Sequence, residues 1–310
     1  MAVATRVDPK SYFTAEEWAP LARRSAWKGL ALVAHCWAVI GLCWAGVIVA
    51  SHYLGWFWPL TLILAVPIIG GRQLGLGILQ HDAAHGALHP DPKVGDWVSD
   101  VLCLSGVERY RKYHLQHHKF AQQLEDPDLG LSAPFPITRG SLRRKIVRDL
   151  TGQTFFKQRF GASFDRVKKS RSFGAGLREI GEEAMRQRRF LIGNLAGLLV
   201  LTLAGYWWTW FVLWMLPMAT WYPLVTRLRN IAEHACVAKN EPDPLRHART
   251  TRANWIERLL IAPYYVNYHC EHHMFMHLPC YSLPRAHRIL RERGVTRGML
   301  IERGDRKSVV

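Results

Sequence analysis

Nine residues near the C-terminal end of the sequence, HCEHHMFMH from His269 to His277, contain four histidines, a glutamate and a cysteine. Residues three and four apart are neighbours on a helix, so His269, His272 and His273 could converge on one point. Imidazole is the commonest metal ligand among side chains. The segment therefore favours a metal site over a pH-sensing or merely polar patch.

Three further groups of histidines occur in the chain, in the segments LQHDAAHGALH, YHLQHHKF and RNIAEH. One zinc ion takes at most four protein ligands, so nine imidazoles point to two metals. Five- or six-coordinate geometry with open positions suits iron that binds dioxygen better than it suits zinc. The nine candidate metal ligands are His81, His85, His114, His117, His118, His234, His269, His272 and His273.

Two charge-free stretches indicate the elements that must position these groups. No Asp, Glu, Lys or Arg occurs in the 43 residues 29–71 or in the 37 residues 190–226. A membrane span needs roughly 20 apolar residues, so each stretch is long enough for two spans. Two long buried helices of a soluble protein are the alternative, but such helices normally have an amphipathic stripe. We predict two helical hairpins, 29–51 with 57–80 and 190–205 with 208–227.

The distribution of cations sets the expected orientation. Both predicted hairpin turns lack Lys and Arg, whereas the N-terminal and middle segments are basic. The positive-inside rule then places both termini and all four histidine groups in the cytoplasm, beside an inner or plasma membrane. The predicted fold class is all-α and integral to the membrane, with about four transmembrane helices and a cytoplasmic helical cap holding a di-metal site. We divide this single domain, 1–310, into an N-terminal segment 1–28, a first hairpin 29–80, a cap with a basic segment 81–189, a second hairpin 190–227 and a C-terminal cap 228–310.

The net charge of +17 is concentrated in the middle of the chain. Residues 131–189 contain fifteen Lys or Arg against five Asp or Glu, together with several phenylalanines. A basic, aromatic segment beside a membrane favours contact with anionic lipid headgroups. Nucleic acid is the rival partner for a basic patch, but no nucleic-acid motif appears, and we expect none to bind. We expect the six cysteines to be reduced and see no cleavable signal peptide.

The histidine motifs resemble the histidine boxes of the membrane fatty acid desaturase superfamily, in its acyl-lipid branch. The similar features are HxxxH at His81, HxxHH at His114 and at His269, and Asn230 four residues before His234; the resemblance runs from about Gly75 to Leu283. It implies a cap with two non-haem irons, the nine histidines as ligands and Asn230 placed to hold a water on one iron. It also implies dioxygen-dependent removal of hydrogens from neighbouring methylenes of an acyl chain in a narrow tunnel.

Carboxylates close to the boxes are candidates for holding the ligand rings. A ligating imidazole usually donates its other N–H to a carboxylate or carbonyl. The candidates are Asp82, Glu233 and Glu271, with Asp126 and Asp128, although the last two could equally shape a turn. Of the remaining histidines, we expect His89 and His277 outside the ligand set, His35 and His52 in structural roles, and His247 and His287 in solvent.

Electrons should come from a separate ferredoxin or cytochrome-type carrier, because the segments outside the spans and boxes are too short for a fused haem domain. A basic face with Arg109, Arg111 and Lys112 could dock an acidic carrier. The predicted activity is desaturation of a lipid acyl chain. The alternatives are a di-iron hydroxylase or ketolase of a lipid or carotenoid and, more remotely, a metal transporter or sensor. Transport is disfavoured because its sites commonly lie near the bilayer midplane.

Overall fold

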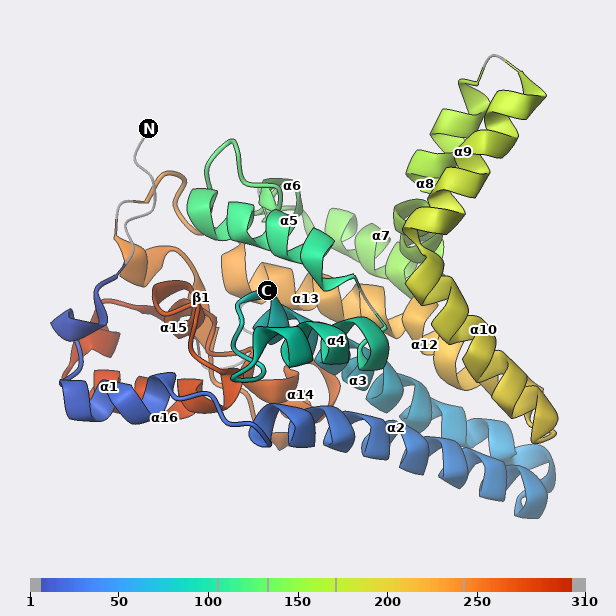
Figure 1. Ribbon diagram of the computed structural model, residues 1–310, viewed down its shortest axis with the longest axis horizontal. Helices are drawn as coiled ribbons and strands as arrows, with labels where there is room; N and C mark the ends of the chain where they lie inside the picture. Colours follow the sequence, from blue (N-terminus) through green and yellow to red (C-terminus); the bar gives the residue numbers. More distant parts are fainter. Residues whose placement is uncertain (1–6, 105, 133, 171, 242, 303–310) are drawn as a thin grey trace. The chain divides into compact units, whose positions relative to one another are not determined.

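The computed structural model describes residues 7–302 except 105, 133, 171 and 242, and these residues are mostly helical. They form two compact units. The first combines the chain up to Ala38 with Leu74–Ile137 and the chain from Val225 onward; the second combines Val39–Gln73 with Thr138–Leu224. Three helices contribute residues to both units: α2 (Lys28–Tyr53), α3 (Leu62–Ala84) and α13 (Trp221–His234) (Figure 1).

Two helices of the described chain are long and apolar enough to cross a membrane. They are Lys28–Tyr53, with 26 residues, and Gly55–Ala84, with 30 residues, in which the 3-10 turn η2 (Gly55–Thr61) leads into α3. Both lie in the predicted first hairpin. Length and composition therefore support two candidate spans.

The predicted second hairpin takes a different form. Its first helix, α10 (Arg188–Leu203), has 16 residues, and the following segment is divided into α11 (Trp207–Trp210), the π-helical turn η3 (Phe211–Met215) and α12 (Leu216–Ala219). Pro217 lies in this divided segment, and proline cannot donate a backbone N–H to continue a helix. A total of four spans stays a prediction.

The basic middle segment forms three helices of the second unit, α7 (Arg139–Leu150), α8 (Gln153–Lys168) and α9 (Phe173–Arg186). Helices α8 and α9 lie side by side (Figure 1), and the Arg166 guanidinium joins them through Glu179 at 3.0 Å and Glu183 at 2.7 Å. Phe164 and Phe173 are exposed. Exposed rings among cations are compatible with the lipid contact predicted for this segment, which stays a prediction.

The first unit has an apolar core that joins its N-terminal and C-terminal segments. Phe13 packs edge-on against Phe275, with ring centroids 5.3 Å apart, and the buried Leu290 belongs to the same cluster. Helix α1 (Ala15–Ala22), which begins with a capping box at Thr14, contacts α16 (Leu283–Glu292). This core supports α15 (His269–Met274), the helix with the densest histidine motif.

A two-stranded parallel sheet is the one departure from the predicted all-α class within the described residues. Strand β1 (Arg249–Thr251) pairs with β2 (Leu300–Glu302), with Thr250 opposite Ile301. The other elements of the first unit are η1 (Pro9–Ser11), α4 (Pro92–Leu102), α5 (Val107–Phe120), α6 (Leu129–Ser132), η4 (Pro244–Arg246), α14 (Trp255–Leu260), η5 (Pro263–Tyr265), η6 (Cys280–Ser282) and η7 (Val295–Arg297).

The first turn of α2 approaches the segment that follows the first histidine group. A Cβ atom added to Gly29 would lie 2.1 Å from the carbonyl oxygen of Leu88, which is a backbone atom and cannot swing away. A Cβ atom added to Gly41, on the same helix, meets nothing within 4 Å. Glycine is therefore required sterically at the first position and not at the second.

Substitution of these two glycines should have opposite effects. We expect Gly29→Ala to lower the free energy of unfolding by roughly 1–3 kcal/mol through overpacking. Gly41→Ala should leave it unchanged or raise it by up to about 1 kcal/mol, since alanine favours the helix. Thermal unfolding of the detergent-solubilised variants measures both. Equal stability of the two variants would contradict the close approach of α2 to Leu88.

Candidate metal centre

Four helices, α3, α5, α13 and α15, bring the nine predicted histidines together within the first unit, most of them at or near a helix C-terminal end, whereas His269 is the first residue of α15. His81 lies in the last turn of α3, and His85 follows that helix directly. The second group occupies the last turns of α5, His234 is the last residue of α13, and α15 ends one residue after His273. Each ring is attached to a helix or to the residue next to one, and this limits how far the ring can move.

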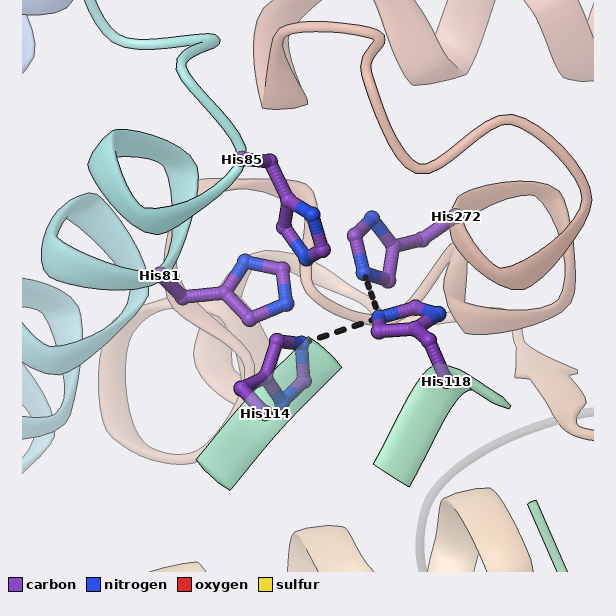
Figure 2. A group of neighbouring side chains, drawn as sticks. All are labelled: His81, His85, His114, His118 and His272. Atoms are coloured by element: carbon purple, nitrogen blue, oxygen red, sulfur yellow. Dashed lines mark hydrogen bonds between the residues drawn. The ribbon is translucent and has the colours of Figure 1, made fainter. Parts of the chain in front are cut away.

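The rings form two groups, each able to hold one metal ion. The ligand atoms within each group lie within 4.8 Å of one another. Figure 2 shows the larger group, in which rings from α3, α5 and α15 face a common space. The larger group is His81, His85, His114, His118 and His272; the smaller group is His117, His234, His269 and His273.

Helical geometry divides each HxxHH motif between the two groups. Consecutive residues on a helix point about 100° apart, whereas residues i and i+4 lie on one face. Thus His269 and His273 share one group, with ring centroids 4.7 Å apart, while His272 joins the other. The expectation that the three histidines of HCEHH converge on one point is therefore wrong.

The ring nitrogens of the larger group lie so close together that hydrogen bonds between them cannot satisfy all of their donors and lone pairs. Nε2 of His118 lies 2.9 Å from Nε2 of His114 and 3.0 Å from Nε2 of His272 (Figure 2). One ring nitrogen carries at most one proton, and both nitrogens of His85 are buried with no hydrogen-bond partner among the described residues. In the smaller group, Nε2 of His234 and His269 face each other at 2.9 Å. These convergent lone pairs fit metal ions.

Burial keeps most of these rings neutral. Removal from water, reinforced by neighbouring imidazoles, lowers the pKa well below the usual histidine value for seven of them. A neutral imidazole retains a lone pair for a metal. The seven rings are His85, His114, His118, His234, His269, His272 and His273.

His117 differs because a carboxylate holds it. Its Nδ1 lies 2.8 Å from Oδ1 of the buried Asp126, and 3.7 Å from Asp128. Burial alone would lower the pKa of His117, but the hydrogen bond and the charge of Asp126 outweigh it and raise the pKa. Asp126 also accepts from the backbone N–H groups of Gln122 and Asp128, so it both shapes the turn and orients the ring.

The other predicted carboxylates make different contacts. Asp82 accepts from the backbone N–H of Cys280 at 2.9 Å and lies 3.7 Å from Nδ1 of His81. Glu233 pairs with the Arg229 guanidinium at 2.6 Å and lies 3.7 Å from Nε2 of His269. Arg229 is not among the predicted site residues, although its i,i+4 spacing to Glu233 on a helix is a recognisable signal of an ion pair.

Glu271 does not hold a ligand ring. It is fully buried and accepts from the Thr250 hydroxyl and from Nδ1 of His287, each at 2.5 Å. The predicted role beside the ligands is therefore replaced by one that fastens α15 to β1 and α16. His287 is mostly buried as well, and the buried His247 contacts the carbonyl oxygen of Glu241 at 2.7 Å, so the prediction that both are solvated is wrong.

Asn230 lies one helical turn before His234 on α13. Its Oδ1 atom is buried and has no hydrogen-bond partner among the described residues. An unpaired buried acceptor costs about 1–3 kcal/mol unless a water or ligand satisfies it. The position is therefore compatible with the predicted water-holding role, which stays a prediction.

Arg111 is not part of a free basic face. Its guanidinium donates to the carbonyl oxygens of Ala83 at 3.0 Å and Ala84 at 2.9 Å, and it pairs with Asp96. It thus links α5 to the end of α3, beside His85. Arg109 is exposed, and Lys112 pairs with Glu108 at the surface, so only these two of the three predicted docking cations face solvent.

Comparisons with known proteins agree with the histidine motifs. Residues 55–301 match the family model described as fatty acid desaturase. The chain is 24% identical over 273 residues to a protein of Bradyrhizobium elkanii named dihydrorhizobitoxine desaturase, and the match covers 84% of this chain and 74% of that protein.

Removal of one histidine ring from the smaller group should cause loss of the bound metal. We expect His273→Ala to weaken metal retention by more than about tenfold and to abolish turnover, since the smaller group has no spare ligand. Elemental analysis of the purified variant measures the loss. His89→Ala is the matched control, because among the described residues the His89 ring hydrogen-bonds to the Asp91 backbone and lies outside both groups. Full metal content in His273→Ala would contradict the assignment.

Loss of the Arg111 guanidinium should disturb the larger group. Arg111→Met keeps much of the volume but removes the donors to α3, so we expect metal content to fall and unfolding to cost about 1–3 kcal/mol less. Lys112→Met, on the exposed side of the same helix, should preserve both. Normal metal content and stability in Arg111→Met, with slower carrier-dependent turnover, would instead restore the docking role.

Proposed function

The chain belongs to the fatty acid desaturase family, and on that premise we propose that it is a membrane-bound, dioxygen-dependent di-iron enzyme that introduces a double bond into an acyl chain. The observation that carries this proposal is the pair of adjacent imidazole groups, one of five rings and one of four. The membrane location rests on the two candidate spans and on the family.

We propose the nine histidines as iron ligands. When bound, the iron pair would supply the activation of dioxygen. The protein's part is to hold the rings in place and out of water and to keep the seven with lowered pKa values neutral. Asp126 fixes the tautomer of His117 by accepting from its Nδ1, which leaves Nε2 free for a metal. Arg229 neutralises Glu233 beside His269, and Asn230 offers an acceptor for a bound water.

The proposed reaction requires two electrons from a reductant. Two hydrogen atoms leave neighbouring carbons of the substrate, and two electrons and two protons come from outside; together they convert one dioxygen into two waters. We propose that a separate electron-carrier protein delivers the electrons on the cytoplasmic side. Arg109 and Lys112 remain as candidate docking cations.

Hydroxylation is the competing outcome, since the same centre would give an alcohol if oxygen were transferred to the substrate carbon. The Bradyrhizobium relative is named a desaturase, which favours the double bond. The nature of the product therefore decides between the two reactions.

The test combines metal analysis with product analysis. Protein purified in detergent should contain close to two irons per chain. Mass spectrometry of lipids and free acids from expressing cells should show species that lack two hydrogen atoms, and cells expressing His118→Ala should not. Species heavier by one oxygen atom would establish a hydroxylase instead. A single zinc, or no metal, would contradict the di-iron proposal and favour the transporter or sensor.

A further inference from the structure

A cavity of about 650 Å³ in the first unit reaches the wall that the two metal groups share. It is lined by the N-terminal segment, by α5 and by the end of α15 with the residues that follow it. His118, from the larger group, and His273, from the smaller group, both line it, and their ring centroids lie 4.4 Å apart. A molecule in this cavity would touch both ligand sets.

The walls of the cavity are mainly apolar. Trp18 contributes from α1 and Leu115 from α5. Met274, Phe275 and Met276 contribute from the end of α15 and the residues that follow it. Methionine side chains are flexible and adapt to the shape of a hydrocarbon. The volume lies within the range of about 300–1,000 Å³ that is usual for small-molecule sites.

One cation accompanies this apolar lining. Among the described residues that line the cavity, Lys119 is the only lysine, arginine, aspartate or glutamate. It is exposed, and its ammonium group lies 5.0 Å from the centre of the Phe120 ring, so the side chain contributes to the lining and also meets solvent. Lys119 follows His118 directly on α5, so the charge and the metal ligand are fixed to one rigid element.

Building on the proposed function, we propose that this cavity binds the substrate and that the substrate is an amphiphile with a free carboxylate. The carboxylate would pair with the Lys119 ammonium, and the carbon chain would lie along Leu115 and Met274 toward His118 and His273. One cation in the lining of an apolar cavity complements one anionic head, whereas an uncharged ester head offers it no charge-assisted bond.

Photolabelling tests the site without relying on turnover. The probe is hexadecanoic acid with a diazirine on its chain, compared with the methyl ester of the same compound, and the protein is held in lipid nanodiscs. We expect the acid to label the segments 115–119 and 274–277. The ester should label them about tenfold less, because it lacks the charge-assisted bond to Lys119.

Two lysines on α5 give a matched pair of variants. Lys119→Gln should reduce labelling by the acid to the level of the ester. Lys112→Gln should keep the preference for the acid, since Lys112 lies two turns away, pairs with Glu108 and does not line the cavity. Equal acid labelling in the two variants would overturn the carboxylate assignment.

A blocking variant separates the cavity from the metal centre. Leu115→Trp should fill the cavity, abolish labelling by both probes and stop turnover, while iron content stays at the wild-type level. Wild-type turnover in Leu115→Trp would overturn the cavity as substrate site and leave the proposed function intact. Absence of iron and turnover from the wild-type protein would overturn the proposed function, and this inference with it.

Discussion

The convergence of nine imidazoles, six of them on buried residues and three on half-buried ones, is the constraint on which the first unit depends. Their nitrogens point at one another across 2.9–3.0 Å in several pairs, an arrangement that leaves lone pairs unsatisfied unless cations are bound. Three of the helices that hold the rings, α3, α5 and α13, end at the centre, whereas the short helix α15 places rings there from both its first and its last turn. Because the C-terminal end of a helix carries partial negative charge, this arrangement also favours cations in the space between the rings.

Helices that stop at the candidate metal centre leave their last carbonyl groups to be satisfied, and two arginines donate to them. Arg111 donates to the last carbonyls of α3, and Arg249 donates to Ala232 and Ala235 at the end of α13, each at 2.9 Å. Arg249 comes from strand β1, whose next residue, Thr250, bonds to Glu271 of α15. The small sheet therefore fastens two ligand helices at once, which explains its presence in an otherwise helical fold.

Local spacing in the sequence predicted that these nine histidines would be the ones brought together, because the i, i+3 and i+4 positions of each motif are visible as a short-range pattern. The partition of each motif between two groups also follows from helical geometry, but only once two centres are considered. The contacts of Arg111, Glu271 and His287 were not predictable. Their partners lie on other elements and depend on tertiary packing, for which a single sequence gives no signal. The sequence likewise gives no clear signal, apart from Pro217, that the predicted fourth span is interrupted by the π-helical turn η3.

The six residues of α15, HCEHHM, each have a separate contact to make, which explains why histidines are so closely spaced in this segment. His269 and His273 face the smaller group and His272 faces the larger one, while Cys270 and Met274 pack into the core with Phe13 and Leu290. Glu271, fully buried, bonds to β1 and α16. Every residue of this helix is buried or half-buried. Insertion or deletion of one residue would rotate the rings away from their groups. The core, the support of the ligands and the cavity wall thus all depend on one and a half turns of helix, so the tolerance for substitution should be lowest here.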